Sequence, residues 1–231
     1  MALLFLNVPA AHNDHTNKNT SLNNYSKREM VMKTRAFIRI AAVMLTATII
    51  ASAMPALAQD KHVAKAQAWA EQTLRGWMKD PVVIEAVKAQ NAKHAAFDAA
   101  KIDALDKQWR AETKAAAKPL INEVMGNPLS AYLKKKEAES KGLVTEIFVM
   151  DNKGLNVGQS DVTSDYWQGD EAKWQKTYSV GPTAVFVDKI EQDESTQKFQ
   201  TQVSISVVDP AGGAVIGAVT VGLDVEMLMD M

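Results

Sequence analysis

The segment from Ser164 to Tyr178 has the composition of a small-molecule site. The chain is only 6% aromatic, yet this short stretch holds two tyrosines and two tryptophans, separated by carboxylate, amide and ammonium side chains. Aromatic walls with a few polar groups are the usual lining of a pocket for a small ligand. The residue types therefore predict a ligand site, and the alternative is a surface loop whose rings cover the edge of a sheet.

The charged residues of this segment leave the charge of the ligand open. Aromatic faces attract cations, and Asp165 or Asp170 would supply a counter-charge, which favours an amine. Lys173 or Lys176 could equally hold an acid. We therefore expect a small polar metabolite, either an amine or amino acid or a carboxylate.

Catalysis is the less favoured interpretation. Asp165 with Asp170 or Glu171 could form the acid–base pair of a carboxylate-based hydrolase, but such residues also suit sugar binding or loop capping. The sequence has no Ser-His-Asp set and no glycine-rich phosphate loop, so we predict no enzyme, no catalytic residue and no cofactor. His62 and His94 stand in polar surroundings without a carboxylate at metal-ligand spacing, and we predict no metal site.

The N-terminal residues have the pattern of a targeting sequence. Residues 1–31 are interpreted as a disordered leader or an over-called start of translation. Residues 32–58 follow the order of a secretory signal peptide: a basic start, an uncharged apolar run and a small-residue cleavage motif that ends at Ala58. The apolar run is short for a membrane span, so we expect cleavage after Ala58 and export to the periplasm. The alternative is an uncleaved N-terminal anchor that leaves the domain facing the periplasm.

Residues 59–231 are predicted to form one domain, long enough for a well-packed core. They hold 20 Lys or Arg and 25 Asp or Glu, and a net charge of −5 argues against nucleic acid as a partner. The chain has no Cys, and an exported domain without disulfides fits the bacterial periplasm.

The first part of this domain, residues 59–142, is predicted to be helical. Apolar residues recur at three- and four-residue steps from Asp60 to about Trp77. Asp80-Pro81 marks another helix start, because Asp can cap free amides and Pro suits the first helical position. Further helices are expected over 97–117, 119–125 and 128–141.

The leading helix leaves one question of packing open. Trp69, Thr73 and Trp77 lie on its apolar stripe. The stripe could pack on the protein's own sheet, or it could form the seam of a homodimer.

The second part, residues 143–231, is predicted to be a sheet, because the apolar period changes to two. The turn that follows the first strand ends in Gly154, which can adopt a positive φ. One short helix is expected near Gly169-Asp170, with Asp170 and Trp174 on one face. The whole is an α+β domain with helices packed on a five-stranded antiparallel sheet. The strands are expected at 144–150, 155–159, 184–190, 199–208 and 215–225.

Three segments carry a resemblance to a known family. They are residues 80–87 followed by Gln90-Asn91, the strand and turn at 147–157, and the closing hairpin at 209–213 with 215–218. Together they resemble a single Cache domain, a PAS-like extracytoplasmic sensor.

The resemblance implies a pocket over one face of the sheet that takes a small polar metabolite. It places four rings on the wall, three charged residues as polar anchors, and two contacts on the third strand. The implied ligand contacts are Tyr166, Trp167, Trp174 and Tyr178; Asp165, Asp170 and Lys173; and Phe186 and Asp188.

The expected partners follow from the same resemblance. Cache domains serve chemoreceptors, kinases and cyclases, whereas this sequence ends at Met231 without an output domain. We therefore expect a stand-alone exported form that signals through a separately encoded membrane receptor, kinase or cyclase. The alternative is a periplasmic interaction module whose aromatic rings fill the cavity and bind no ligand.

Overall fold

A computed structural model of the protein describes residues 54–192 and 198–231, and residues 56–231 form one compact unit. The predicted leader at 1–31 and residues 32–53 of the predicted signal lie outside the described residues. Within the described part, no helix is both long enough and apolar enough to span a membrane.

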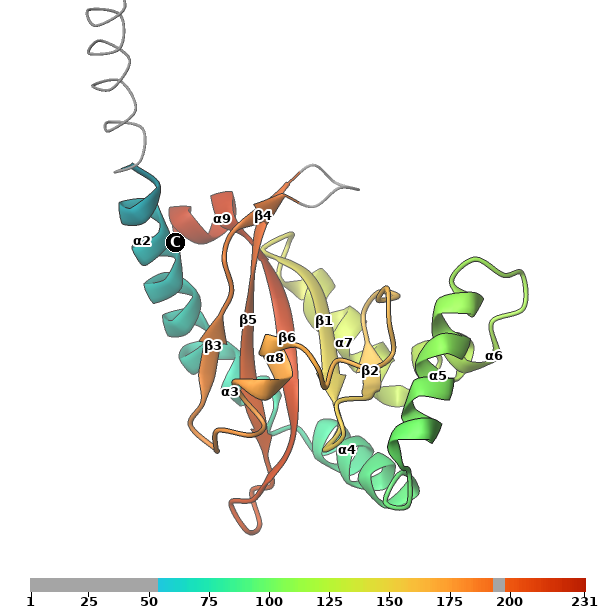
Figure 1. The fold of residues 1–231 in the computed structure, drawn as a ribbon. Coiled ribbons are helices and arrows are strands. Elements are labelled where there is room, and N and C mark those ends of the chain that lie inside the picture. Colours follow the sequence, from blue (N-terminus) through green and yellow to red (C-terminus); the bar gives the residue numbers. More distant parts are fainter. Residues whose placement is uncertain (1–53, 193–197) are drawn as a thin grey trace, which may run out of the picture. The chain divides into compact units, whose positions relative to one another are not determined.

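The elements follow the predicted order, helices first and strands second, except that residues Val225–Asp230 form a final helix that was not predicted (Figure 1). The helices are α2 (Met54–Trp69), η1 (Ala70–Leu74), α3 (Arg75–Trp77), α4 (Pro81–Lys93), α5 (Ala99–Glu112), α6 (Pro119–Met125), α7 (Pro128–Glu139), α8 (Ala172–Gln175) and α9 (Val225–Asp230). The strands are β1 (Val144–Met150), β2 (Asn156–Gln159), β3 (Val185–Val187), β4 (Glu191–Gln192), β5 (Phe199–Val208) and β6 (Val215–Asp224). The predicted α+β class is confirmed.

The helix starts follow the predicted capping chemistry. Asp80 Oδ1 accepts from the Val82 amide at 3.1 Å, and Pro81 occupies the first position of α4. The leading helix already includes Met54, the first described residue, so it extends further toward the N-terminus than the expected start at Asp60.

The helical run from α2 to α3 contains one π-helical stretch, η1. The wider turn keeps both Ala70 and Leu74 buried against the sheet. A helix of uniform pitch was expected here, so the π stretch is a local difference from the prediction.

The sheet is antiparallel, with strand order β2-β1-β6-β5-β3, and β4 pairs with β5. The sixth strand was not predicted, because Glu191–Gln192 is short, charged and exposed. The turn after β1 has the predicted form, with Gly154 at φ 83°.

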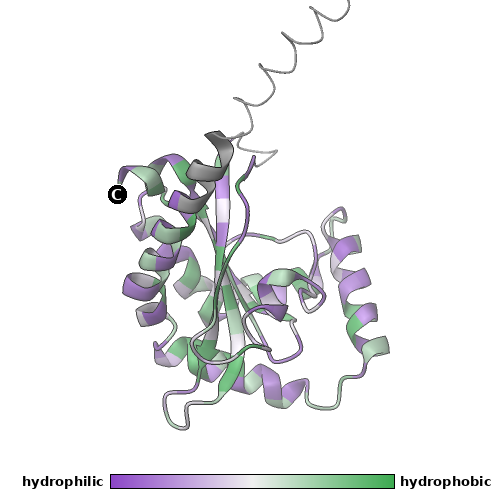
Figure 2. Cartoon of the chain, turned by 60° about the vertical axis from the view of Figure 1, so that its left-hand side comes forward, coloured by the Kyte–Doolittle hydropathy of each residue, from purple (hydrophilic) through white to green (hydrophobic). Residues whose placement is uncertain are grey.

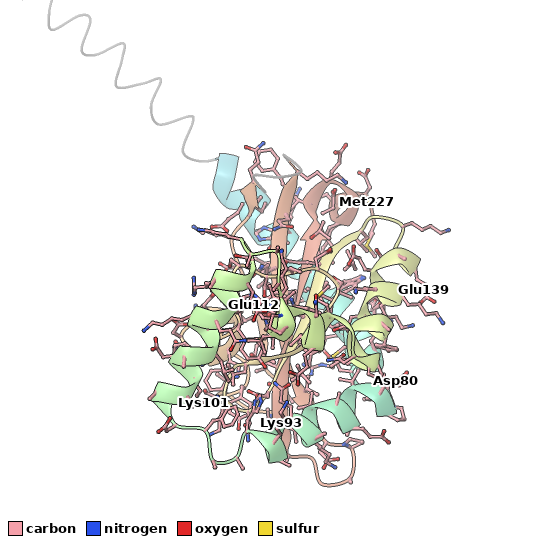
Figure 3. The ribbon with its side chains drawn as sticks, turned by 90° about the vertical axis from the view of Figure 1, so that its right-hand side faces the viewer. Asp80, Lys93, Lys101, Glu112, Glu139 and Met227 are labelled. Carbon is pink, nitrogen blue, oxygen red and sulfur yellow. The ribbon has the colours of Figure 1, made fainter. Side chains whose placement is uncertain are left out.

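One face of the sheet is aliphatic and packs against α2, η1, α4 and α7. The strand residues of this core are Val144, Ile147, Val149, Val157, Val203, Ile205, Val207, Val219, Val221 and Leu223. Figure 2 shows the hydrophobic colour along the strands and hydrophilic patches on the outward sides of the helices. In Figure 3, α7 with Glu139 lies at the right of the view and α5 with Lys101 at the left. This aliphatic layer leaves the opposite sheet face for other chemistry.

The aromatic stripe of the leading helix packs on the protein's own core. Trp69 is 5% exposed and meets Trp77 edge to face, with ring centroids 5.6 Å apart. The exposed positions of the same helix include Lys61, Gln67 and Glu71. Of the two arrangements that the sequence left open, the structure shows packing on the protein's own sheet.

The expectation of polar surroundings for the two histidines is wrong. His62 has no exposed surface, and its Nε2 bonds to the Asp188 carbonyl at 3.2 Å. His94 is 3% exposed, and its Nδ1 lies 2.8 Å from Asp151 Oδ2. The contact between His94 and Asp151 could not be predicted from the sequence. The two residues are 57 positions apart and meet only when α4 packs on the turn after β1.

Candidate functional site

The second face of the sheet carries polar and aromatic side chains and lies under the chain between β2 and β3. We call residues 164–183, which contain α8, the cover segment. α8 contacts β5 and β6 and lies in front of these strands in Figure 1. A sheet face that is polar and yet covered is a place where a polar ligand can be held.

One row of four side chains crosses this face and is here called the middle row. Phe148 on β1 stands in register with Thr220 on β6. Thr220 is the register partner of Ser204 on β5, and Ser204 is the register partner of Phe186 on β3. Neighbouring strands lie about 4.8 Å apart, so the middle row spans roughly 14 Å.

The centre of the middle row is a buried pair of hydroxyls. Ser204 Oγ and Thr220 Oγ1 lie 2.9 Å apart, and neither residue has any exposed surface. A core strand at this depth would ordinarily carry aliphatic residues, because a buried hydroxyl must find a hydrogen-bond partner. Each hydroxyl has two acceptor lone pairs and one proton, so the pair retains capacity for a further polar partner.

Two lysines of the cover segment reach over the two rings of the middle row. Lys173 Nζ lies 5.3 Å from the centroid of Phe148, and Lys176 Nζ lies 4.4 Å from that of Phe186. Both distances lie within the range of cation–π attraction. Lys173 also pairs with Glu171, Nζ to Oε2 at 2.8 Å. The cover segment therefore presents an ammonium group at each end of the row.

Trp174 and Tyr178 form the apolar part of the cover. Their rings stack with centroids 4.8 Å apart and pack against the sheet residues Phe148, Met150 and Ala218. Burial, and to a lesser degree the nearby Asp151 carboxylate, raise the pKa of Tyr178, so its hydroxyl is a neutral hydrogen-bonding group.

The turn between β1 and β2 anchors the cover segment through two indoles. Trp174 Nε1 donates to the Asp151 carbonyl at 3.1 Å, and Trp167 Nε1 donates to the Lys153 carbonyl at 2.8 Å. Gln168 N also donates to the Gly154 carbonyl at 2.7 Å. The position of the cover therefore depends on the conformation of this turn.

The turn between β1 and β2 is itself held by the C-terminal end of α4. Asp151 is fully buried, and its carboxylate accepts from His94 Nδ1 at 2.8 Å and from Gln90 Nε2 at 3.1 Å. The amides of Lys153 and Leu155 donate to its other oxygen at 2.8 and 3.0 Å. This carboxylate joins α4, the turn and, through the Asp151 carbonyl, the cover.

Two of the predicted contacts face α5 instead of the sheet. Tyr166 is 3% exposed and stacks on Trp109 with centroids 5.3 Å apart, and burial strongly raises the pKa of its hydroxyl. Asp165 lies 3.1 Å from Arg110 of α5 and accepts from Gln168 Nε2 at 2.7 Å. Both residues are therefore engaged with α5 and with the first part of the cover.

The remaining predicted contacts divide between the sheet edge and solvent. Asp170 is exposed and lies just before α8, whose N-cap residue is Glu171 and not Gly169 or Asp170. Asp188 accepts from its neighbour's amide through Oδ1, and its carbonyl bonds to His62 and Thr201.

The structure thus brings Lys173, Trp174 and Tyr178 together over the sheet at Phe148, and it places Phe186 at the other end of the middle row, under Lys176. The sequence missed Phe148, Ser204 and Thr220, although Ser and Thr at apolar strand positions were a signal that was available. Across the described residues, no group of three or more His, Asp or Glu side chains is arranged to hold a metal ion.

Comparisons with known proteins give only distant likenesses. No family model and no curated protein matches the chain. Solved structures that resemble it include the ligand-binding domain of the Campylobacter jejuni chemoreceptor Tlp3 in complex with 4-methylisoleucine, at 13% identity, a TM-score of 0.35, and coverage of 71% of this chain and 65% of that one.

Two histidine kinase domains are similar at the same level. One is the extracellular domain of the putative histidine kinase vpHK1S-Z8, at 9% identity and a TM-score of 0.41, covering 76% of this chain and 56% of that one. The other is the sensor domain of the V. cholerae histidine kinase DctB, at 11% identity and a TM-score of 0.33, covering 64% and 58%. The chain spans less than two thirds of the length of all three structures. Each of the three is a ligand-binding, extracellular or sensor domain of a chemoreceptor or histidine kinase.

Proposed function

We propose that residues 59–231 form a periplasmic sensor domain that binds a small polar metabolite between the cover segment and the middle row. Ligand contacts are assigned to Lys173, Trp174, Tyr178 and Phe186, with Trp167 positioning the cover. Asp170 and Asp188 are assigned to its outer rim, and Asp165 and Tyr166 are assigned to holding the cover against α5. The signal peptide is proposed to direct export, with cleavage after Ala58.

The observation that carries this proposal is the buried hydroxyl pair beneath a charged cover. Ser204 and Thr220 have no exposed surface, and the segment above them contributes Lys173 as well as the aromatic rings. A purely structural lid would bury aliphatic groups, because each buried polar group costs about 1–3 kcal/mol when it lacks a partner. Polar groups on the sheet face and on the cover above it favour a polar ligand between them once the cover moves.

Binding requires the cover to move, since the hydroxyls are enclosed in the structure. The far end of the cover is held to β5 by Ser206, whose Oγ lies 3.0 Å from the Thr177 carbonyl and 2.7 Å from that of Gly181. It is held to the leading helix by Arg75, whose Nη2 donates to the Thr183 carbonyl at 3.0 Å. A ligand that favours one position of the cover therefore shifts the contacts of η1 and α3 as well.

These coupled contacts suggest how the domain reports occupancy. Arg75 also pairs with Glu71, Nε to Oε2 at 2.6 Å, so the cover is linked to the π-helical stretch of the leading helix. The proposed output is a change in this helix that a separately encoded membrane receptor, kinase or cyclase recognises.

A thermal-shift screen of amines, amino acids and small carboxylates tests the function. A ligand at one hundred times its dissociation constant should stabilise the protein by about 2.7 kcal/mol. Trp174→Ala should weaken binding, whereas Phe199→Ala, which removes an exposed ring at the start of β5, should leave the affinity unchanged.

The alternative is an interaction module that binds no metabolite. The stacking of Trp174 on Tyr178 and the mutual hydroxyl bond of Ser204 and Thr220 favour it, since both satisfy the site internally. Two results together would support this alternative: no compound stabilises the protein, and a membrane partner is recovered without any added compound.

A further inference from the structure

We propose that the ligand carries an acid group, and that Glu171 occupies the place of this group beside Lys173 in the free protein. The inference rests on the proposed function and names the ligand class for the same site. It also assigns to Glu171 the role of an internal competitor for the ligand.

Lys173 is the less exposed of the two lysines that lie over the middle row. Its side chain is 13% exposed, and its ammonium group lies over Phe148, itself 2% exposed. Removing an ammonium group from water is costly unless a counter-charge accompanies it. In this structure Glu171 supplies that counter-charge at 2.8 Å.

Glu171 is placed so that it can be exchanged. It stands at the N-cap position of α8, yet its side chain makes no capping hydrogen bond and is 37% exposed. The pair joins residues only two positions apart, so breaking it disturbs no contact between distant elements. A carboxylate of the ligand can therefore replace the Glu171 carboxylate while the latter turns to water.

The middle row suits an acid more than an amine. Lys173 and Lys176 stand over its two ends, and the hydroxyls of Ser204 and Thr220 between them can donate to a carboxylate. A ligand without an acid group would leave Lys173 paired with Glu171, and it would form no ion pair of its own with Lys173.

The carboxylates nearby do not reverse this balance. Asp165 is paired with Arg110 on the side of α5, and Asp170 is exposed. Glu146, on the row next to the middle row, accepts from Gln202 Nε2 at 2.9 Å across Gly222. An amine would therefore meet lysines over the middle row and carboxylates that are engaged or remote.

The test is calorimetric titration of the purified full chain with matched series of compounds. Each series contains an aliphatic carboxylic acid, its amide and the corresponding primary amine, and α-amino acids form a further arm. Acids and amino acids should bind, and their amides and simple amines should bind at least tenfold more weakly.

Two variants isolate the exchange. Glu171→Gln removes the internal competitor and should tighten acid binding about two- to fivefold. Lys173→Met retains packing on Phe148 and should weaken acid binding at least tenfold. Glu139→Gln, at another short-range Lys–Glu pair, and Lys101→Met, at another ammonium over a ring, are the matched controls and should leave the affinity unchanged.

The possible results separate this inference from the proposed function. If amides or amines bind as tightly as acids, or if Glu171→Gln weakens acid binding, the sensor function stands and the acid assignment is wrong. If no compound of either charge binds, the proposed function fails and the inference fails with it.

Discussion

The buried carboxylate of Asp151 should be one of the most sensitive positions in the domain. It has no exposed surface and accepts four hydrogen bonds, two from α4 and two from its own turn. The Asp151 carbonyl also accepts a hydrogen bond from the Trp174 indole. Loss of its partners should therefore reduce both the stability of the fold and the order of the cover.

The expected magnitude for His94→Ala follows from what remains. Removing one member of a buried pair costs about 3–5 kcal/mol when the other charge is left alone. Asp151 keeps three of its four donors in this variant, so we expect a loss of roughly 2–3 kcal/mol. Asp151→Ala strands all four donors and should cost more, about 4 kcal/mol or above.

The assay is urea unfolding followed by circular dichroism, with ligand affinity measured on the folded variants. Asp209→Ala is the matched control, because Asp209 also accepts an amide two residues ahead but sits in a hairpin at the surface. The control should lose less stability than either variant and should keep its ligand affinity.

Asp151→Asn separates charge from shape. Its remaining oxygen can still accept from the turn amides, so it should lose less stability than Asp151→Ala while still loosening α4. A loss below about 0.5 kcal/mol for His94→Ala, or equal losses for Asp151→Ala and Asp209→Ala, would refute the reasoning.

Three further predictions concern the turn, an alkaline titration and an acid titration. Gly154→Ala should cost 2 kcal/mol or more in urea unfolding, because φ is 83° and a Cβ would lie 2.5 Å from the Gly169 backbone. Burial raises the pKa of Tyr132 to about 12, so its neutral form stabilises the fold fully below the ordinary tyrosine pKa, and this stabilisation is lost as pH rises toward 12. The substitution Tyr132→Phe should therefore remove a late step from the ultraviolet titration of the tyrosines. Burial opposes ionisation of Asp224, but hydrogen bonds from Lys198 and the α9 amides lower its pKa overall. The ionised Asp224 therefore stabilises the fold above the ordinary aspartate pKa, and this stabilisation is lost as pH falls below it. The substitution Asp224→Asn should reduce the fall of the melting temperature at acid pH, and an unchanged fall would contradict this.

Much of the fold could be predicted because its signals are local. Asp80-Pro81 and Asn127-Pro128 begin helices through bonds within one turn, and the period of two from Val144 onward marks the strands. Gly154 marks the turn for a steric reason that no other part of the chain can alter. The π stretch and the two-residue β4 could not be predicted, since packing against the sheet decides them.

The site could be predicted in part. The residue types drew attention to the segment that covers the sheet, but they did not show which neighbouring element each charged side chain would face. Asp165 turns to Arg110, and Lys173 turns to Phe148, although both lie in the same short segment. The choice depends on α5 and β1, which are distant in sequence.

The sequence alone determined an α+β order of elements, an aromatic and charged segment between two strands, and an acidic domain without cysteines. The tertiary structure decided that Phe148, Thr220, Ser204 and Phe186 form one row and that His94 meets Asp151. The reason is that capping and periodicity act over a few residues, whereas register between strands and the pairing of buried polar groups are set by the packing of the whole domain.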